Sequence, residues 1–166
     1  MREINRFYLD IKNIDELKKV NLENNEIEVK LIKTIDFNLN KFFYKQIGKN
    51  HRWTDRLSWN DNIWVNYINN KSVNTFVLTY NKNLAGYFER IYNKQNNEFE
   101  IAYFGILHEY RNKKLGAYLL SKAIELSFKD GAKRIWVHTC TFDHKNAIKN
   151  YLARGMKIYK KETVEI

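Results

Sequence analysis

Alternation of apolar and polar positions predicts strands at several places along this chain. In the first forty residues, Ile27–Lys33 places Ile27, Val29 and Leu31 on one face and charged residues on the other, which indicates a half-buried strand. Ile4–Lys12 is a second candidate strand. Both segments lie in the polar part of the chain, where the pattern is weakest.

Three β-rich runs follow in the middle of the chain, at Thr75–Tyr80, Leu84–Tyr92 and Phe99–Leu107. Polar turns at residues 81–83 and 93–97 separate them. Connections this short join antiparallel neighbours, so the pattern predicts a meander.

Apolar residues at helical spacing predict helices over Asn38–Ile47, Trp59–Ile68 and Leu115–Lys129. Asn60 or Asp61 is expected to cap the second helix. The Asp-Gly pair after Lys129 suits the end of the third, because glycine takes the left-handed cap conformation.

The pattern in the last third of the chain predicts a strand, a helix and a second strand. We expect a strand over Arg134–Thr139, a helix from Asp143 or His144 to Arg154 capped by Gly155, and a strand over Met156–Thr163. A meander followed by helix, strand, helix and strand predicts one α/β domain over residues 1–166 with a mixed, mostly antiparallel sheet.

Composition narrows the class of protein. The chain has 166 residues, 44% of them hydrophobic, which suits one packed domain. Its one cysteine, Cys140, excludes a disulfide within the chain and a multi-cysteine zinc site. The N-terminus lacks a secretory pattern, and no apolar run approaches the roughly 20 residues that span a bilayer. We therefore expect a cytoplasmic protein without membrane partners.

The formal net charge of +10 allows two explanations. It fits an anionic partner such as a phosphorylated ligand or a nucleic acid. It also fits a compositional bias towards Lys and Asn in a chain without proline. The densest basic cluster is Arg111–Lys114, where a phosphorylated cofactor would explain it, so no nucleic acid is expected.

The segment Tyr110–Ala117 has the chemistry of a phosphate site. It connects a predicted strand to an amphipathic helix, and the N–H groups at a helix start have no intrahelical partners. Gly116 lets a phosphate approach the backbone, and Arg111, Lys113 and Lys114 add positive charge. An ordinary basic helix start is the alternative.

This segment resembles the acetyl-CoA motif of the GNAT superfamily of acetyltransferases, Arg/Gln-x-x-Gly-x-Gly/Ala. Arg111 takes the first place and Gly116 the last, whereas Lys114 stands where the middle glycine is usual. The resemblance covers about residues 73–160 and includes Glu100–Ile106, Trp136–Thr139, Asn146-Ala147, Tyr151 and Gly155-Met156. It implies a single GNAT-like domain with residues 73–160 as the acetyl-CoA-binding core and residues 1–72 as the acceptor-side region.

The resemblance implies that pantetheine lies between two splayed parallel strands, the first of which contains a bulge. The Ile106 N–H, or one beside it, would then serve as an oxyanion donor. Asn146 would bind pantetheine or the adjacent backbone, or cap its helix. The implied acetyl-CoA-binding residues are Phe104, Gly105, Ile106, Arg111, Asn112, Lys113, Lys114, Leu115, Gly116, Ala117 and Asn146.

For catalysis, the resemblance implies that Tyr151 protonates the leaving thiolate and that Glu100 acts as the base. Tyr151 could instead be an aromatic core residue, and Glu100 a solvated residue paired with a Lys. Glu89, His138 and water stay open as alternative bases, and His138 could also be a hydrogen-bonded core histidine. Cys140 as a nucleophile is a further alternative to a buried small hydrophobe.

The acceptor side is expected at His51–Trp64, where aromatic residues alternate with charge. The expected substrate-binding residues are Trp53, Asp55, Arg56, Glu89, Tyr103 and His138. Their carboxylates favour a cationic amine, and Arg56 favours a carboxylate, so the expected acceptor is a small molecule, an amino acid or a peptide. The alternatives are a non-catalytic acyl-CoA sensor and, third, a basic nucleic-acid-binding domain; a homodimer is left open.

Overall fold

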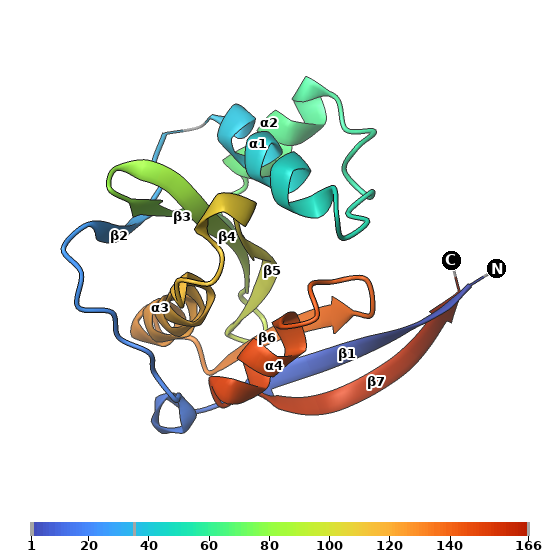
Figure 1. Cartoon of the computed structure of the whole chain (residues 1–166). Coiled ribbons are helices and arrows are strands. Elements are labelled where there is room, and N and C mark those ends of the chain that lie inside the picture. Colours follow the sequence, from blue (N-terminus) through green and yellow to red (C-terminus); the bar gives the residue numbers. More distant parts are fainter. Residues whose placement is uncertain (1, 35, 166) are drawn as a thin grey trace.

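Seven strands form one mixed sheet in the order β2-β3-β4-β5-β6-β1-β7 (Figure 1). The computed structural model describes residues 2–34 and 36–165. The strands are β1 (Glu3–Ile11), β2 (Ile27–Leu31), β3 (Val73–Tyr80), β4 (Asn83–Asn93), β5 (Glu98–Ile106), β6 (Arg134–Cys140) and β7 (Lys157–Glu165). The α-helices are α1 (Phe37–Gly48), α2 (Asp61–Asn69), α3 (Leu115–Lys129) and α4 (Ala147–Ala153). The predicted α/β class is confirmed.

Every predicted strand and helix is present, and the bounds differ by a few residues. Asn60 is the cap of α2, since its side chain accepts a hydrogen bond from the Ile63 N–H at 2.9 Å. The largest difference is the start of α4, which begins at Ala147 and not at Asp143 or His144. Asp143 instead accepts hydrogen bonds from the Cys140 N–H at 2.9 Å and the Thr139 hydroxyl at 2.7 Å, which fixes the loop after β6.

The two parallel strands splay apart, as expected. β5 and β6 are in register only over Glu98–Glu100 against Arg134–Trp136. Beyond these residues β5 stays paired with β4, and a register shift leaves Ala102 as the extra residue of a bulge. The two strands therefore open into a wedge that starts near Glu100.

Strand β1 lies between β6 and β7 and is antiparallel to both. Leu9, for example, faces Val137 on β6 and Ile158 on β7. Residues 1–72 are therefore divided in the sheet, because their first strand pairs with the two C-terminal strands. That the segment with α1 and α2 forms an acceptor side stays a prediction.

The helices cover the two faces of the sheet unequally (Figure 1). On one face α3 packs Leu119, Leu120 and Ile124 into the main core against residues such as Ile135. On the other face a smaller cluster joins Phe43 and Ile47 of α1 to Val77 of β3, Tyr87 of β4 and Leu107. Helices α1 and α2 thus cover the β3–β5 part of this face, and the wedge opens beside them. Within residues 2–34 and 36–165, no helix is long and apolar enough to cross a membrane.

Replacing Gly155, the glycine just after the end of α4, tests how much its backbone conformation and its contact with Glu16 stabilise the fold. Its φ is +101°, and an added Cβ would lie 2.1 Å from the Glu16 carbonyl oxygen. Gly131 has a φ of +94° and no atom within 4 Å of such a Cβ, so it is a matched control. Gly131→Ala should cost about 1–2 kcal/mol of unfolding free energy from backbone strain alone. Gly155→Ala should cost about 1–3 kcal/mol more because of the clash. Urea denaturation measures both, and equal losses would show that the contact with Glu16 adapts freely.

Candidate active site

A cavity of about 1410 Å³ occupies the wedge and extends to the start of α3. Most of its lining comes from the splayed parts of β5 and β6, the turn before and into α3, the loop between α1 and α2, and the loop between β6 and α4. A few residues of β1, α1, β4 and α4, among them Arg6 and Tyr151, complete the lining. Pockets for single small ligands usually measure about 300–1,000 Å³. The cavity is therefore large enough for two molecules at once.

The segment Tyr110–Ala117, which we call the phosphate turn, leaves the N–H groups at the start of α3 free, as the sequence predicts. Tyr118 N–H donates to the Lys114 carbonyl at 3.1 Å. Among the described residues, none of the N–H groups of 112–117 donates a hydrogen bond to protein. An added Cβ on Gly116 would meet Asn150 Nδ2 at 3.8 Å and Ile106 Cγ1 at 3.9 Å, which are ordinary van der Waals contacts. Such a row of free donors at a helix start fits a pyrophosphate.

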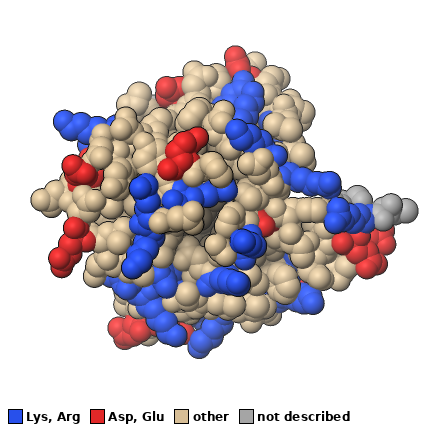
Figure 2. Space-filling model, viewed as in Figure 1, with Lys and Arg blue, Asp and Glu red and all other residues tan. Residues whose placement is uncertain are grey.

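Lys114, which stands where the motif usually has its middle glycine, takes the backbone conformation of a glycine. It has a φ of +61°, in the left-handed region that glycine adopts most easily, and Asn112 has a φ of +63°. The backbone therefore keeps the shape of a glycine turn, and Lys114 also lines the cavity together with Arg111. Lys113 does not line it, because its ammonium lies over the Tyr80 ring at 5.8 Å. In Figure 2, Lys and Arg side chains surround the hollow on this face.

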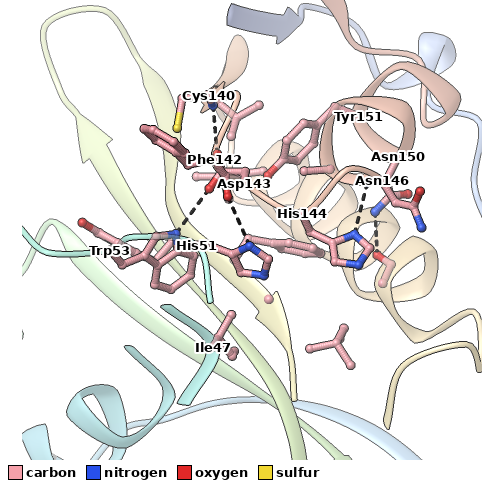
Figure 3. Close-up of a pocket in the computed structure, with 18 of the residues that line it drawn as sticks. Ile47, His51, Trp53, Cys140, Phe142, Asp143, His144, Asn146, Asn150 and Tyr151 are labelled. Carbon is pink, nitrogen blue, oxygen red and sulfur yellow. Dashed lines mark hydrogen bonds between the residues drawn. The ribbon is translucent and has the colours of Figure 1, made fainter. Parts of the chain in front are cut away.

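Two asparagines of the α4 segment face the turn. Asn146 makes no side-chain cap hydrogen bond and lines the cavity, which argues against the capping alternative. Asn150 was missed from the sequence. Its amide donates to the Gly116 carbonyl at 3.1 Å and so ties α4 to α3 (Figure 3). Its position four residues after Asn146, on the same helical face, was the available signal.

Tyr151 lies at the inner wall of the cavity (Figure 3). Its side chain is buried, and its ring packs edge-on to Phe104 with 6.4 Å between the centroids. Burial, together with the charge of Asp143, raises the pKa of the Tyr151 hydroxyl above its usual value. The hydroxyl therefore keeps its proton at neutral pH, which a proton donor requires.

Glu100 and Glu89, the two candidate carboxylate bases, have different surroundings. Glu100 is half-buried and lines the cavity, and in the described residues it forms no ion pair with a Lys. Burial raises its pKa, and the charge of Arg56 partly opposes this. Glu89 is fully buried, does not line the cavity and accepts two hydrogen bonds from Arg56. Glu89 is therefore not placed to meet a substrate.

Arg56 faces inward and not toward a ligand. Its Nη1 lies 3.0 and 3.1 Å from the two Glu89 oxygens, and 4% of its side chain is exposed. The guanidinium also lies within 6 Å of five aromatic rings. These rings are those of Tyr44, Trp59, Trp64, Tyr67 and Tyr103. The pair anchors the α1–α2 loop to β4.

Residues of the α1–α2 loop contact the β6–α4 loop (Figure 3). The Trp53 indole N–H donates to Asp143 at 3.3 Å, and His51 Nδ1 lies 3.3 Å from the Phe142 carbonyl oxygen. Arg111 of the phosphate turn lies 3.4 Å from His51 Nε2. These contacts join the α1–α2 loop to the β6–α4 loop and to the phosphate turn. We call the part of the cavity that the phosphate turn lines its phosphate end; Asp55, Glu100 and Tyr103 line the cavity as well.

His138 and Cys140 both line the cavity from β6. His138 is exposed, between the rings of Tyr8 and Trp136, and is not a core histidine. Desolvation by its neighbours and the charge of Arg6 lower its pKa. Burial and the charge of Asp143 raise the pKa of the Cys140 thiol, which disfavours the thiolate that a nucleophile needs.

Comparison with known proteins identifies the family of this chain. The family model described as the acetyltransferase (GNAT) family matches residues 37–156. No curated protein matches the chain.

Solved structures match the fold at low identity. A conserved protein of unknown function from Staphylococcus epidermidis is 14% identical with a TM-score of 0.66, over 98% of this chain and 60% of that one. A GCN5-related N-acetyltransferase from Sphaerobacter thermophilus is 10% identical with a TM-score of 0.74, over 95% and 49%. An aminoglycoside acetyltransferase from an uncultured soil sample, in complex with sisomicin, is 12% identical with a TM-score of 0.64, over 86% and 94%. The chain thus spans about half to three fifths of the first two structures' lengths, and these likenesses show the fold. With the family model matching most of its length, the chain belongs to the GNAT acetyltransferase family.

Proposed function

We propose that the chain is an N-acetyltransferase that moves an acetyl group directly from acetyl-CoA to a primary amine. The observation that carries the proposal is one cavity, which contains the free N–H groups of residues 112–117, a protonated tyrosine and a carboxylate. Its volume of about 1410 Å³ accommodates a donor and an acceptor together, as direct transfer requires. The phosphate end of the cavity is the proposed site for the CoA pyrophosphate.

The residues of the turn fit acetyl-CoA in charge and in shape. The backbone of 112–117 would bind the pyrophosphate, with Arg111 and Lys114 beside it. Phe104, Gly105 and Ile106 on the open edge of β5, with Asn146 opposite, would bind the pantetheine arm. Acetyl-CoA supplies an activated acetyl group as a thioester.

The Ile106 N–H is the proposed oxyanion donor. Leu107 N–H donates to the Ala85 carbonyl on β4 at 2.8 Å. Successive N–H groups of a strand point to opposite edges, so the Ile106 N–H points away from β4 and into the wedge. A donor in this position would stabilise negative charge that develops on the carbonyl oxygen, a contribution typically worth about 2.7–4 kcal/mol.

Glu100 is the proposed base and Tyr151 the proposed acid. An ammonium group of pKa near 10 must lose a proton before the amine can attack, and Glu100 would accept that proton, directly or through water. Tyr151 would donate its proton to the departing thiolate. On the acceptor side, Trp53, Asp55, Tyr103 and His138 are the proposed contacts with the amine.

Release of free thiol from acetyl-CoA tests the function. The purified chain, incubated with acetyl-CoA and a panel of primary amines, should produce CoA at a rate that depends on one class of amine. A non-catalytic sensor of acyl-CoA is the second candidate, favoured only by the phosphate turn. Tight CoA binding without thiol release for any amine would support the sensor.

Glu100→Gln should change the pH profile. Because burial raises the pKa of Glu100, the carboxylate form is lost at a higher pH than for an ordinary glutamate. In the wild type, the reacting complex contains the Glu100 carboxylate and the ammonium whose proton it accepts, so log kcat/KM should be level between the pKa of Glu100 and that of the amine, and fall with slope one below the Glu100 pKa. The variant depends on the neutral amine already present in solution, so its log kcat/KM should rise with slope one up to the amine pKa, and it should be about 100-fold slower at neutral pH.

The control for this prediction is Glu28→Gln, on an exposed strand position far from the cavity lining. This variant should keep the pH profile of the wild type. If Glu100→Gln keeps the level region of the wild type, another group is the base, and His138 is the next residue to replace.

A further inference from the structure

Two features of the cavity bear on which amine it takes. The first is the position of Arg56, the residue of the α1–α2 loop that the sequence offers for binding a substrate carboxylate. Both oxygens of Glu89 already bind its guanidinium, and five aromatic rings surround it. A substrate carboxylate would have to displace a buried partner from this site, so Arg56 is not available to it.

The second feature is a set of three carboxylates that form no ion pair in the described part of the chain. Asp55, Glu100 and Asp143 line the cavity, and within residues 2–34 and 36–165 none of them forms an ion pair. Asp55 is exposed and accepts hydrogen bonds from the hydroxyls of Tyr44, at 2.9 Å, and Tyr103. In a chain of net charge +10, cavity carboxylates that form no ion pair among the described residues leave a place for a cationic ligand.

The walls beside these carboxylates are aromatic. Trp53 and Tyr103 meet edge-to-face, with 5.0 Å between their ring centroids, and both line the cavity. Such rings favour an alkylammonium over a hydrated anion. Arg6 also lines the cavity, and its guanidinium lies 3.4 Å from Glu162 of β7. Arg111 and Lys114, which also line the cavity, belong to the phosphate turn. The remaining lining cations are Arg56, which pairs with Glu89, Arg52, which lies over the Phe142 ring at 4.7 Å, and the exposed Lys145.

We propose that the acceptor is an aliphatic diamine or polyamine, which carries a second ammonium group and no carboxylate. Asp55, held in place by two tyrosine hydroxyls, binds the ammonium that does not react, and Glu100 faces the amine that does. This inference rests on the proposed function, since it names the acceptor of that same site.

Matched acceptors test the inference. Diamines of three to six carbons are compared with monoamines of equal length, and 1,4-diaminobutane and 1,5-diaminopentane with ornithine and lysine, which add a carboxylate. A charge-assisted contact is worth about 1.5–3 kcal/mol. The diamines should therefore exceed the monoamines in kcat/KM by about 10-fold or more. Ornithine and lysine should fall below their diamines by a similar factor.

Asp55→Asn is the matched variant, with Asp61→Asn on the exposed first turn of α2 as its control. Asp55→Asn should bring the ratio of diamine to monoamine rates close to one, whereas Asp61→Asn should keep the wild-type ratio. CoA affinity, measured by calorimetry, should be unchanged in both and shows that each variant is folded.

The outcomes distinguish failure of the diamine inference from failure of the proposed function. Thiol release with monoamines or with lysine at the rate of the diamines overturns the inference and leaves the proposed function standing, and so does an unchanged preference in Asp55→Asn. Carboxylate-bearing acceptors that react best would assign Arg6 as their anchor. CoA binding with no thiol release for any amine overturns the proposed function itself.

Discussion

Tyr151→Phe is expected to slow CoA release by about 100-fold or more while leaving CoA affinity nearly unchanged, because general acid catalysis contributes about 10²–10⁴-fold. The substitution removes one oxygen from a buried side chain that lines the cavity and keeps the ring packed against Phe104. Packing is therefore preserved and only the proton donor is lost. Steady-state thiol release at saturating acetyl-CoA, together with calorimetric CoA binding, measures the two effects separately.

The control for this variant is Tyr159→Phe, on the edge strand β7, where the side chain is 46% exposed and does not line the cavity. It should match the wild type in both measurements. If Tyr151→Phe also kept the wild-type rate, the thiolate would leave unprotonated or take its proton from water, and Tyr151 would be a packing residue. A loss confined to CoA affinity would give Tyr151 a role in binding alone.

Arg56→Met is expected to lower the free energy of unfolding by about 3–5 kcal/mol, because it leaves the Glu89 charge buried without a partner. The Glu89 side chain is 0% exposed, and both of its oxygens accept a hydrogen bond from Arg56. Domains of this kind are stable by only about 5–15 kcal/mol, so the loss would be visible as a large shift in the urea midpoint.

Glu89→Leu should cost a similar amount, and the double variant should cost much less than the sum of the two single variants. Lys30→Met breaks an exposed ion pair with Glu28 and should change stability by less than about 1 kcal/mol. Should Arg56→Met cost no more than this control, the buried pair would not be what fastens the α1–α2 loop to the sheet.

Local pattern was enough to predict most of the elements, because side-chain alternation and helical periodicity are set by neighbours in sequence. Leu115–Lys129 has the predicted bounds, and the meander β3–β5 follows from its short turns. The place of β1 between β6 and β7 could not be predicted in this way. Pairing between strands so far apart in the sequence does not change the alternation of apolar and polar residues in either strand.

In the candidate site, too, features set by local sequence were predictable and features set by tertiary packing were not. Free N–H groups at the start of α3 follow from helix geometry alone, so the turn was predictable. The direction of a side chain was not. Arg56 and Lys113 are both basic residues of loops, yet one pairs with Glu89 and the other lies over Tyr80. Only tertiary packing decides which of two such charges meets the ligand.

The position of β1 has a consequence for how the chain folds during synthesis. The ribosome makes β1 first, but both neighbours of β1 in the sheet are made last. Until β6 emerges, Leu9 and Ile11, which are 0% and 1% exposed in the finished protein, have no sheet to join. Loops this long close slowly and leave apolar strands open to other chains. Strand β1 is therefore expected to stay unpaired until β6 and β7 have been synthesised.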